Sequence, residues 1–164
     1  MNANKLLELK KTANNIRRHI INGVYSAGCG HPGGSLSIAD IMAYLYSVEL
    51  RVDPENPADP ARDRFVLSKG HTAPALYGAL AERGFIGKDE ITTLRRIDSR
   101  LQGHPDMKGV PGVDMSTGSL GLGFSAAVGM ALSGKHYGEP YRVYTILGDG
   151  ETEEGQVWEA AMFA

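Results

Sequence analysis

An aspartate between two glycines, placed directly after an apolar segment, is the clearest candidate for chemistry in this sequence. The stretch LGDGETEEG spans residues 147–155 and follows the run YRVYTI. Gly148 and Gly150 allow a sharp turn, so Asp149 would project from the end of the preceding strand. A helix that follows directly would offer free N–H groups to a phosphate, and one carboxylate beside a phosphate commonly holds Mg²⁺. The alternative is a tight turn in which Asp149 caps a helix and the following glutamates are solvated.

Three of the five histidines directly follow a glycine in irregular segments: His31 in CGHPGG, His71 in SKGHTAP and His104 in QGHPD. This shared context predicts one cleft reached by three loops, although a single loop histidine is usually a surface residue. The ordinary pKa of histidine, about 6.5, suits proton transfer near neutrality. Zinc binding is the rival use, but the spacing does not favour it, because no local His-x-x-x-His pair exists. His19 and His136 fall in helical segments and are interpreted as structural.

A third candidate is the glycine-rich stretch DMSTGSLGLGFSAAVGMA at residues 114–131. Gly118, Gly121 and Gly123 would allow the backbone to approach a ligand closely before a helix begins. The Gly121-Leu122-Gly123 run resembles part of a dinucleotide-binding fingerprint. It does not follow an obvious strand, so that interpretation lacks the structural context it requires.

Helices and strands alternate along the chain in a way that would place these segments together. Apolar spacing predicts helices over residues 3–27 and about 120–136, and the runs RFVLS and YRVYTIL are predicted strands. This alternation indicates an α/β fold with a parallel sheet flanked by helices, in a single domain over residues 1–164. Ligands bind beyond the carboxyl ends of such strands, which puts SKGH and GDG on the same edge.

Composition excludes several classes of function. The net charge is −2 and the 17 basic residues form no long patch, so nucleic-acid binding is not expected. No run approaches the roughly 18 apolar residues of a membrane span. The single cysteine, Cys29, excludes an internal disulfide and makes a reducing cytoplasm the default expectation.

Four ordered motifs together resemble the N-terminal thiamine-diphosphate domain of transketolase: CGHPGGSLS, LSKGHTAPALYGAL, GHPDMKGVPGVDMSTGSLGLGFSAAVGMA and GDGETEEGQVWEA. The resemblance extends from about residue 5 to the end of the chain. It is strongest to the separate N-terminal subunit of a split transketolase, whose pyrimidine-binding partner is another polypeptide. In deoxyxylulose-phosphate synthase, the alternative enzyme, the first motif typically lacks the proline after Gly-His.

The resemblance implies a cofactor site for thiamine diphosphate with Mg²⁺ or Ca²⁺. Asp149 matches the metal ligand, and Gly150 matches the glycine whose backbone meets the diphosphate. Three consecutive residues match the segment that contacts the thiazolium and pyrimidine rings, namely Gly118, Ser119 and Leu120.

The resemblance also implies catalytic roles. His71 and His104 match histidines near the reacting thiazolium carbon and the substrate hydroxyls, so His71 belongs to both the cofactor and catalytic sets. His31 matches a histidine that contacts the sugar. Glu154 matches a glutamate at the dimer interface. Cys29 stands where the family usually has serine, which suggests either an oxidation-sensitive thiol beside His31 or simply a small buried residue.

The implied activity is transfer of a two-carbon ketol unit between pentose phosphate pathway sugars, from a ketose phosphate to an aldose phosphate. The implied partners are sugar phosphates and a C-terminal transketolase subunit with the pyrimidine-binding domain, in a homo- or hetero-oligomer. The family's second metal ligand, an asparagine, would lie beyond Ala164. We therefore expect a truncated, inactive piece of the enzyme with a sheet incomplete at its C-terminus; the alternative is a non-catalytic module that binds the partner subunit.

Overall fold

A computed structural model describes residues 2–164, which form two compact units. The first unit contains the described residues up to Leu50 together with Thr72–Gly103, and the second contains Arg51–His71 and His104–Ala164. That both units belong to one domain stays a prediction.

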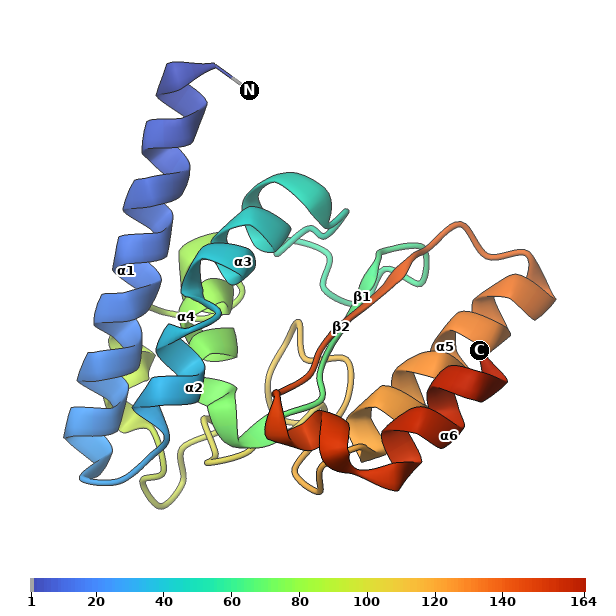
Figure 1. The fold of residues 1–164 in the computed structure, drawn as a ribbon. Coiled ribbons are helices and arrows are strands. Elements are labelled where there is room, and N and C mark those ends of the chain that lie inside the picture. The colour runs from blue at the N-terminus through green and yellow to red at the C-terminus, as the bar shows by residue number, and fades with distance from the viewer. Residues whose placement is uncertain (1) are drawn as a thin grey trace. The chain divides into compact units, whose positions relative to one another are not determined.

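Six helices and two strands make up the regular structure of the described residues (Figure 1). The α-helices are α1 (Ala3–Ala27), α2 (Pro32–Leu36), α3 (Ala39–Tyr44), α4 (Ala73–Arg83), α5 (Leu122–Tyr137) and α6 (Gly155–Phe163). The strands are β1 (Arg64–Leu67) and β2 (Val143–Ile146). Short turns supplement them: a π-helical turn at Leu45–Glu49 and 3₁₀ turns at Gly70–Thr72, Asp89–Thr93 and Gly150–Glu153.

The first unit is built on α1, whose bounds agree with the helix predicted over residues 3–27. The Asn2 side chain caps its start by accepting a hydrogen bond from the Lys5 N–H at 2.9 Å. Gly28, with φ 66°, ends it in the left-handed conformation that glycine adopts at little cost. The buried face of α1, which includes Ile16 and Ile20, packs against α3 and α4.

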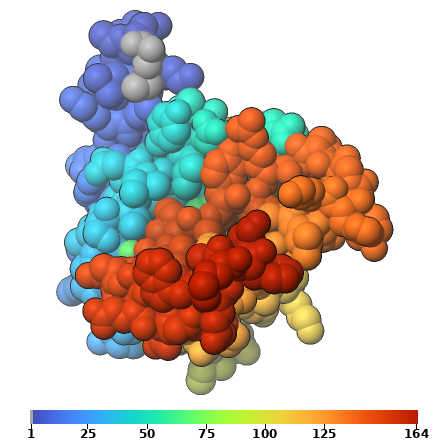
Figure 2. Space-filling model, turned by 45° about the vertical axis from the view of Figure 1, so that its right-hand side comes forward, coloured from blue at the N-terminus to red at the C-terminus, as the bar shows by residue number. Residues whose placement is uncertain are grey.

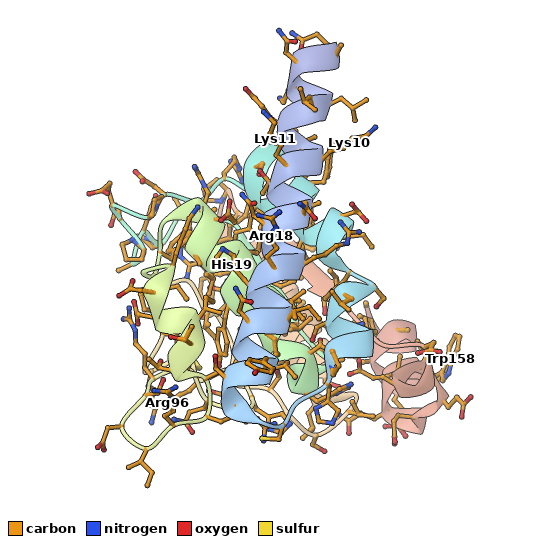
Figure 3. All side chains as sticks on the ribbon, turned by 90° about the vertical axis from the view of Figure 1, so that its left-hand side faces the viewer. Lys10, Lys11, Arg18, His19, Arg96 and Trp158 are labelled. Carbon is orange, nitrogen blue, oxygen red and sulfur yellow. The ribbon has the colours of Figure 1, made fainter. Side chains whose placement is uncertain are left out.

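Charged side chains of α1 point away from that packed face. Figure 3 shows Lys10, Lys11 and Arg18 projecting from the helix, and all three are exposed. His19 lies between the two faces, where its Nε2 is 2.9 Å from Oε1 of Glu82 on α4. This contact ties two helices of the first unit together and agrees with the structural interpretation of His19.

The second unit contains the sheet, in which β1 and β2 pair in parallel. Arg64 is opposite Val143, and Leu67 is opposite Ile146. The segments that follow the two strands therefore begin at the same edge, which confirms the prediction for SKGH and GDG. Helix α5 packs against both strands, and α6 packs against α5.

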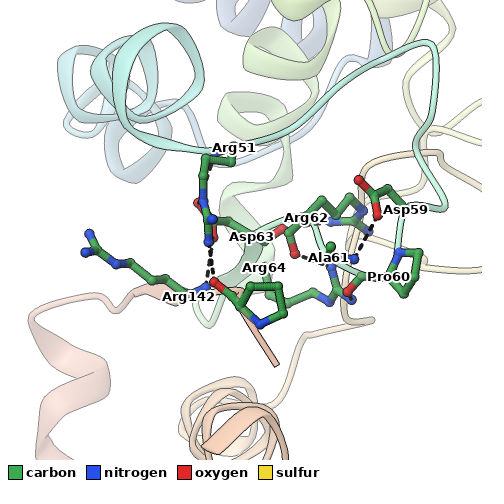
Figure 4. Close-up of polar contacts among 9 residues, drawn as sticks. Arg51, Asp59, Pro60, Ala61, Arg62, Asp63, Arg64 and Arg142 are labelled. Carbon is green, nitrogen blue, oxygen red and sulfur yellow. Dashed lines mark hydrogen bonds and ion pairs between the residues drawn. The ribbon is translucent and has the colours of Figure 1, made fainter. Parts of the chain in front are cut away.

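A buried carboxylate fastens the opposite end of the two strands (Figure 4). Asp63 is fully buried, and its Oδ1 accepts hydrogen bonds from Nη2 of Arg51 and from the N–H of Arg142, both at 2.8 Å. Its Oδ2 accepts the N–H of Arg51 at 2.9 Å. Because Asp63 precedes β1 and Arg142 precedes β2, this cluster fixes the starts of both strands.

A second buried carboxylate attaches the long irregular segment after His104 to the sheet. Asp114 Oδ2 accepts the N–H of Phe65 in β1 at 2.7 Å, and Oδ1 lies 2.5 Å from Nη2 of Arg62. Both side chains of this ion pair are largely buried. The anchored segment leads directly to Gly118. Among residues 2–164 no helix has the length and apolar character that crossing a membrane requires.

Candidate functional site

The candidate site lies at the edge of the second unit where β1 and β2 end. The chain leaves β1 through Ser68, Lys69 and Gly70 to reach His71, and it leaves β2 through Gly148 to reach Asp149. The two segments that follow the strands both contact the glycine-rich segment that precedes α5.

His71 is held near that segment by a close backbone contact at the residue before it. A Cβ added to Gly70 would stand 2.5 Å from the carbonyl oxygen of Thr117, so only glycine fits there. The Thr117 hydroxyl also donates a hydrogen bond to the carbonyl of Leu67 at 2.7 Å. The end of β1 is therefore fixed against the residue that immediately precedes Gly118.

His104 approaches the same segment from the irregular stretch. A Cβ added to Gly118 would lie 3.4 Å from Cδ2 of the His104 ring. His104 itself is exposed, and Gly118 is half-buried. Two of the three predicted histidines, His71 and His104, are thus brought beside Thr117 and Gly118.

Ser119 and Leu120 continue this segment, with Ser119 exposed and Leu120 half-buried. Gly121 follows with φ 83° and forms the N-terminal boundary of α5. A Cβ at Gly123, two residues further, would meet the Cα of Ser68 at 2.7 Å. The start of α5 therefore packs directly on the end of β1. This close packing accounts for the glycine at position 123, so a dinucleotide-binding fingerprint is not needed to explain it.

Asp149 is exposed, and its surroundings leave room for a metal ion and phosphate oxygens. A Cβ added to the neighbouring Gly150 would meet no atom within 4 Å. An accessible carboxylate beside an open glycine backbone is the donor set that Mg²⁺ uses when phosphate and water complete its shell. Among the described residues, no group of three histidine, cysteine, aspartate or glutamate side chains converges to hold a metal ion by itself.

The expected helix directly after Gly150 is wrong in detail. Residues Gly150–Glu153 form a single 3₁₀ turn, and α6 begins only at Gly155. The N-terminus of α6 therefore lies five residues after Gly150, the glycine that was predicted to meet a phosphate. The Trp158 indole donates to the carbonyl of Thr152 at 2.8 Å, which folds this turn back on α6.

Glu151 is the site residue that the sequence did not single out. It is 2% exposed, whereas the neighbouring Glu153 and Glu154 are exposed. Its Oε1 accepts hydrogen bonds from Ser68 Oγ at 2.5 Å and from the Gly121 N–H at 2.9 Å. Its Oε2 accepts the Gly148 N–H at 2.9 Å. One buried carboxylate thereby contacts the ends of both strands and the start of α5.

Lys69 brings a positive charge to this buried acidic region. Its side chain is almost entirely buried, at 6% exposure. Burial lowers the pKa of the Lys69 ammonium below its ordinary value, and the charges of Asp149 and Glu151 oppose that shift. Since Lys69 follows Ser68 at the end of β1, it adds a cation to the edge where a diphosphate would bind.

The remaining predicted residues lie elsewhere on the chain. His31 is exposed at the start of α2 in the first unit, so its grouping with the other two histidines stays a prediction. Cys29 is exposed, which makes the interpretation as a small buried residue wrong. Glu154 is exposed and precedes α6. His136 stacks edge-on against Tyr137 with ring centroids 4.8 Å apart.

Apolar side chains of α6 remain on the surface of the second unit. Trp158 is 60% exposed, Met162 81% and Phe163 71%. Figure 2 shows α6 in red on the visible face, and Figure 3 shows Trp158 projecting from the ribbon. Glu154 stands directly before this helix.

An apolar cavity of about 250 Å³ between α5, β2 and α6 is distinct from the candidate site. Its lining includes Phe124, Val143, Thr145 and Phe163 but none of the predicted site residues. The hydroxyl of Thr145 is buried without a hydrogen-bond partner. The cavity offers few polar groups that could take part in chemistry.

The second unit thus presents a parallel sheet whose strand-end edge carries a glycine-flanked carboxylate, with His71 and His104 close by, an arrangement typical of α/β folds that bind phosphorylated ligands. Residues 9–164 match the family model described as transketolase, thiamine diphosphate binding domain. The chain belongs to this family. Both the α/β fold and the identification from four motifs are therefore confirmed.

Individual relatives agree with the family assignment. The chain is 52% identical over 158 residues to the 6-deoxy-6-sulfo-D-fructose transketolase subunit SqwG of a Clostridium species, covering 96% of this chain and 58% of that subunit. It is 50% identical over 161 residues to human transketolase, covering 98% of this chain and 26% of the human protein. The transketolase structure from Leishmania mexicana superposes with a TM-score of 0.92 at 32% identity, covering 95% of this chain and 25% of that one.

Proposed function

We propose that this chain is the diphosphate-binding part of a transketolase that moves a two-carbon ketol unit from a ketose phosphate to an aldose phosphate. The observation that carries the proposal is the grouping of His71, His104, Gly118 and the exposed Asp149 around one strand-end edge of the second unit. Family membership over residues 9–164 supports the same activity. Pentose phosphate pathway sugars are the proposed substrates.

The residues of the edge fit thiamine diphosphate and a divalent ion. Asp149 would ligate Mg²⁺ or Ca²⁺. The exposed backbone at Gly150 would leave space for the diphosphate and could donate its N–H to a phosphate oxygen. The segment Gly118–Leu120 would lie against the rings. The bound cofactor supplies the carbon nucleophile and the electron sink that ketol transfer needs.

The histidines would handle protons and orient the sugar. His71 and His104 would donate to and accept from substrate hydroxyls, and His31 would contact the sugar chain. Such acid–base assistance is typically worth about 10²–10⁴ in rate. These roles suit histidine because it exchanges protons near neutral pH.

The complete activity needs more protein than this chain provides. The chain spans 58% of the Clostridium subunit and 26% of human transketolase. We propose that a pyrimidine-binding domain or C-terminal subunit completes the site in a homo- or hetero-oligomer. Glu154 and the exposed apolar side chains of α6 would face that partner. A reducing cytoplasm is the proposed location, since the one cysteine of this chain forms no internal disulfide.

Turnover measurements test this proposal. The protein containing this chain, assembled with its partner domain, should transfer ketol units only when thiamine diphosphate and a divalent ion are both present. The 164-residue chain alone should bind the cofactor weakly and show no transfer. If the protein assembles with its partner but the complex neither binds the cofactor nor turns over sugars, the protein is a non-catalytic module. The proposal would then be rejected.

A further inference from the structure

The buried carboxylate of Glu151 connects three segments that are far apart in the sequence. It reaches Ser68 at the end of β1, Gly121 at the start of α5 and Gly148 at the end of β2, with distances of 2.5, 2.9 and 2.9 Å. Two of the three donors are backbone N–H groups, so the carboxylate fixes main chain rather than flexible side chains. Hydrogen bonds to a charged acceptor are stronger than those between neutral groups.

Ser68 extends the connection by one further bond. Its hydroxyl donates to Glu151 and accepts the N–H of Phe124 in the first turn of α5 at 2.9 Å. The start of α5 thus has two N–H groups satisfied by side chains from outside the helix: that of the N-cap Gly121 by Glu151, and that of Phe124 by Ser68. Ser68 is itself fully buried.

Two of the three connected segments lie next to proposed cofactor-binding residues. Gly148 directly precedes Asp149, the proposed metal ligand. Gly121 directly follows Leu120, which ends the segment proposed to lie against the cofactor rings. Any rotation of the Glu151 side chain would release both segments at once.

We propose that Glu151 is a positioning residue that holds the metal-binding turn at Asp149 and the Gly118–Leu120 segment in a fixed mutual arrangement. The inference rests on the proposed function, because those two segments matter together only if one cofactor spans them. Glu151 does not touch the cofactor in this account; it acts through the backbone of Gly121 and Gly148.

The test compares Glu151→Gln with Glu153→Gln in the assembled protein. Glutamine keeps the size of the side chain, but an amide has only one oxygen. Its NH₂ group would therefore point at the N–H of either Gly121 or Gly148, so that two donors face each other. Glu153 is two residues away and exposed, so its substitution controls for the loss of one negative charge. We expect the dissociation constant for thiamine diphosphate with Mg²⁺ to rise about tenfold to a hundredfold in Glu151→Gln, and to stay unchanged in Glu153→Gln.

Hydrogen exchange on the cofactor-free protein supplies a readout that a general loss of stability would not produce. Glu151→Gln should remove protection from the Gly121 and Gly148 amides together while the β1 amide of Val66 stays protected. Equal loss at all three amides would mean a merely structural role and would overturn the inference. If Glu151→Gln does not fold, Ser68→Ala should still raise the same dissociation constant severalfold, and an unchanged value would overturn the inference.

The two proposals fail in different ways. Unaltered cofactor binding in Glu151→Gln, with tight binding in the wild type, would remove the positioning role and leave the proposed function standing. No binding in the wild type and in Glu153→Gln would remove the proposed function and, with it, the inference that depends on it.

Discussion

The imidazole of His104 lies against the backbone of Gly118, so that a Cβ at Gly118 would stand 3.4 Å from Cδ2 of the ring. This contact joins a proposed catalytic histidine to the segment proposed to bind the cofactor. It depends on Asp114, whose buried carboxylate attaches the intervening chain to β1. The positions of His104 and Gly118 are therefore set by the sheet.

Replacing Gly118 with valine should displace the His104 ring, because the branched side chain needs space that the ring occupies. Because the ring is exposed and can move aside, we expect the free energy of unfolding to change by less than about 1 kcal/mol and cofactor affinity to fall. Thermal unfolding with and without thiamine diphosphate measures both effects.

Gly129→Ala is the matched control for this substitution. Gly129 is an exposed interior position of α5, and a Cβ there would meet nothing within 4 Å. Alanine should therefore stabilise the helix by about 0.5–1 kcal/mol and leave cofactor binding unchanged. Normal affinity in Gly118→Val would contradict the assigned contact.

Asp63 should make the stability of the protein fall at acid pH. Burial alone would raise the pKa of Asp63, but hydrogen bonds from the Arg51 side chain and from the backbone N–H groups of Arg142 and Arg51 outweigh it and hold the pKa below its ordinary value. A carboxyl whose folded pKa is depressed stabilises the fold above its unfolded pKa, about 3.9. That stabilisation is lost as pH falls through the lower, folded pKa.

Comparison with Asp63→Asn isolates this contribution. At pH 6–7 the variant should be less stable than the wild type by about 1–3 kcal/mol, since the backbone N–H groups of Arg51 and Arg142 and the exposed Arg51 guanidinium lose a buried, charged acceptor. The difference should shrink as pH falls below about 4. Urea unfolding at a series of pH values measures it, and a difference independent of pH would contradict the assignment.

Thr145→Val should stabilise the protein. The Thr145 hydroxyl is buried beside an apolar cavity and has no hydrogen-bond partner, so valine removes an unsatisfied polar group at nearly constant volume. We expect a gain of about 1 kcal/mol in the free energy of unfolding. Calorimetry checks this, and a destabilisation of similar size would mean that the hydroxyl has a partner in the assembled protein.

Sequence patterns predicted the elements whose boundaries depend on local chemistry. The glycines after α1 and α4 adopt positive φ, and α1 ends where the sequence predicts. The two apolar runs form the predicted parallel strands, because alternation of strand and helix strongly restricts the topology. The position of Asp149 at the strand-end edge follows from the same rule.

Elements that depend on tertiary contacts were predicted less well. The segment GKDEITTLRRI is typical of a short amphipathic helix, but the structure has only the 3₁₀ turn Asp89–Thr93 there, since Arg95 adopts φ 60° and its N–H bonds to the carbonyl of Leu101. Glu151 resembles Glu153 and Glu154 in the sequence. Only the folded positions of Ser68 and Gly121 distinguish it as buried.

The most direct test of the account is the affinity of thiamine diphosphate for the assembled protein as a function of Mg²⁺, measured in the wild type and in Asp149→Ala. Wild-type binding should require the ion and be abolished by a chelator. Asp149→Ala should weaken Mg²⁺-dependent binding at least about tenfold, because a carboxylate ligand is removed. Equal, Mg²⁺-dependent affinity in both proteins would contradict the assignment of Asp149 as the metal ligand.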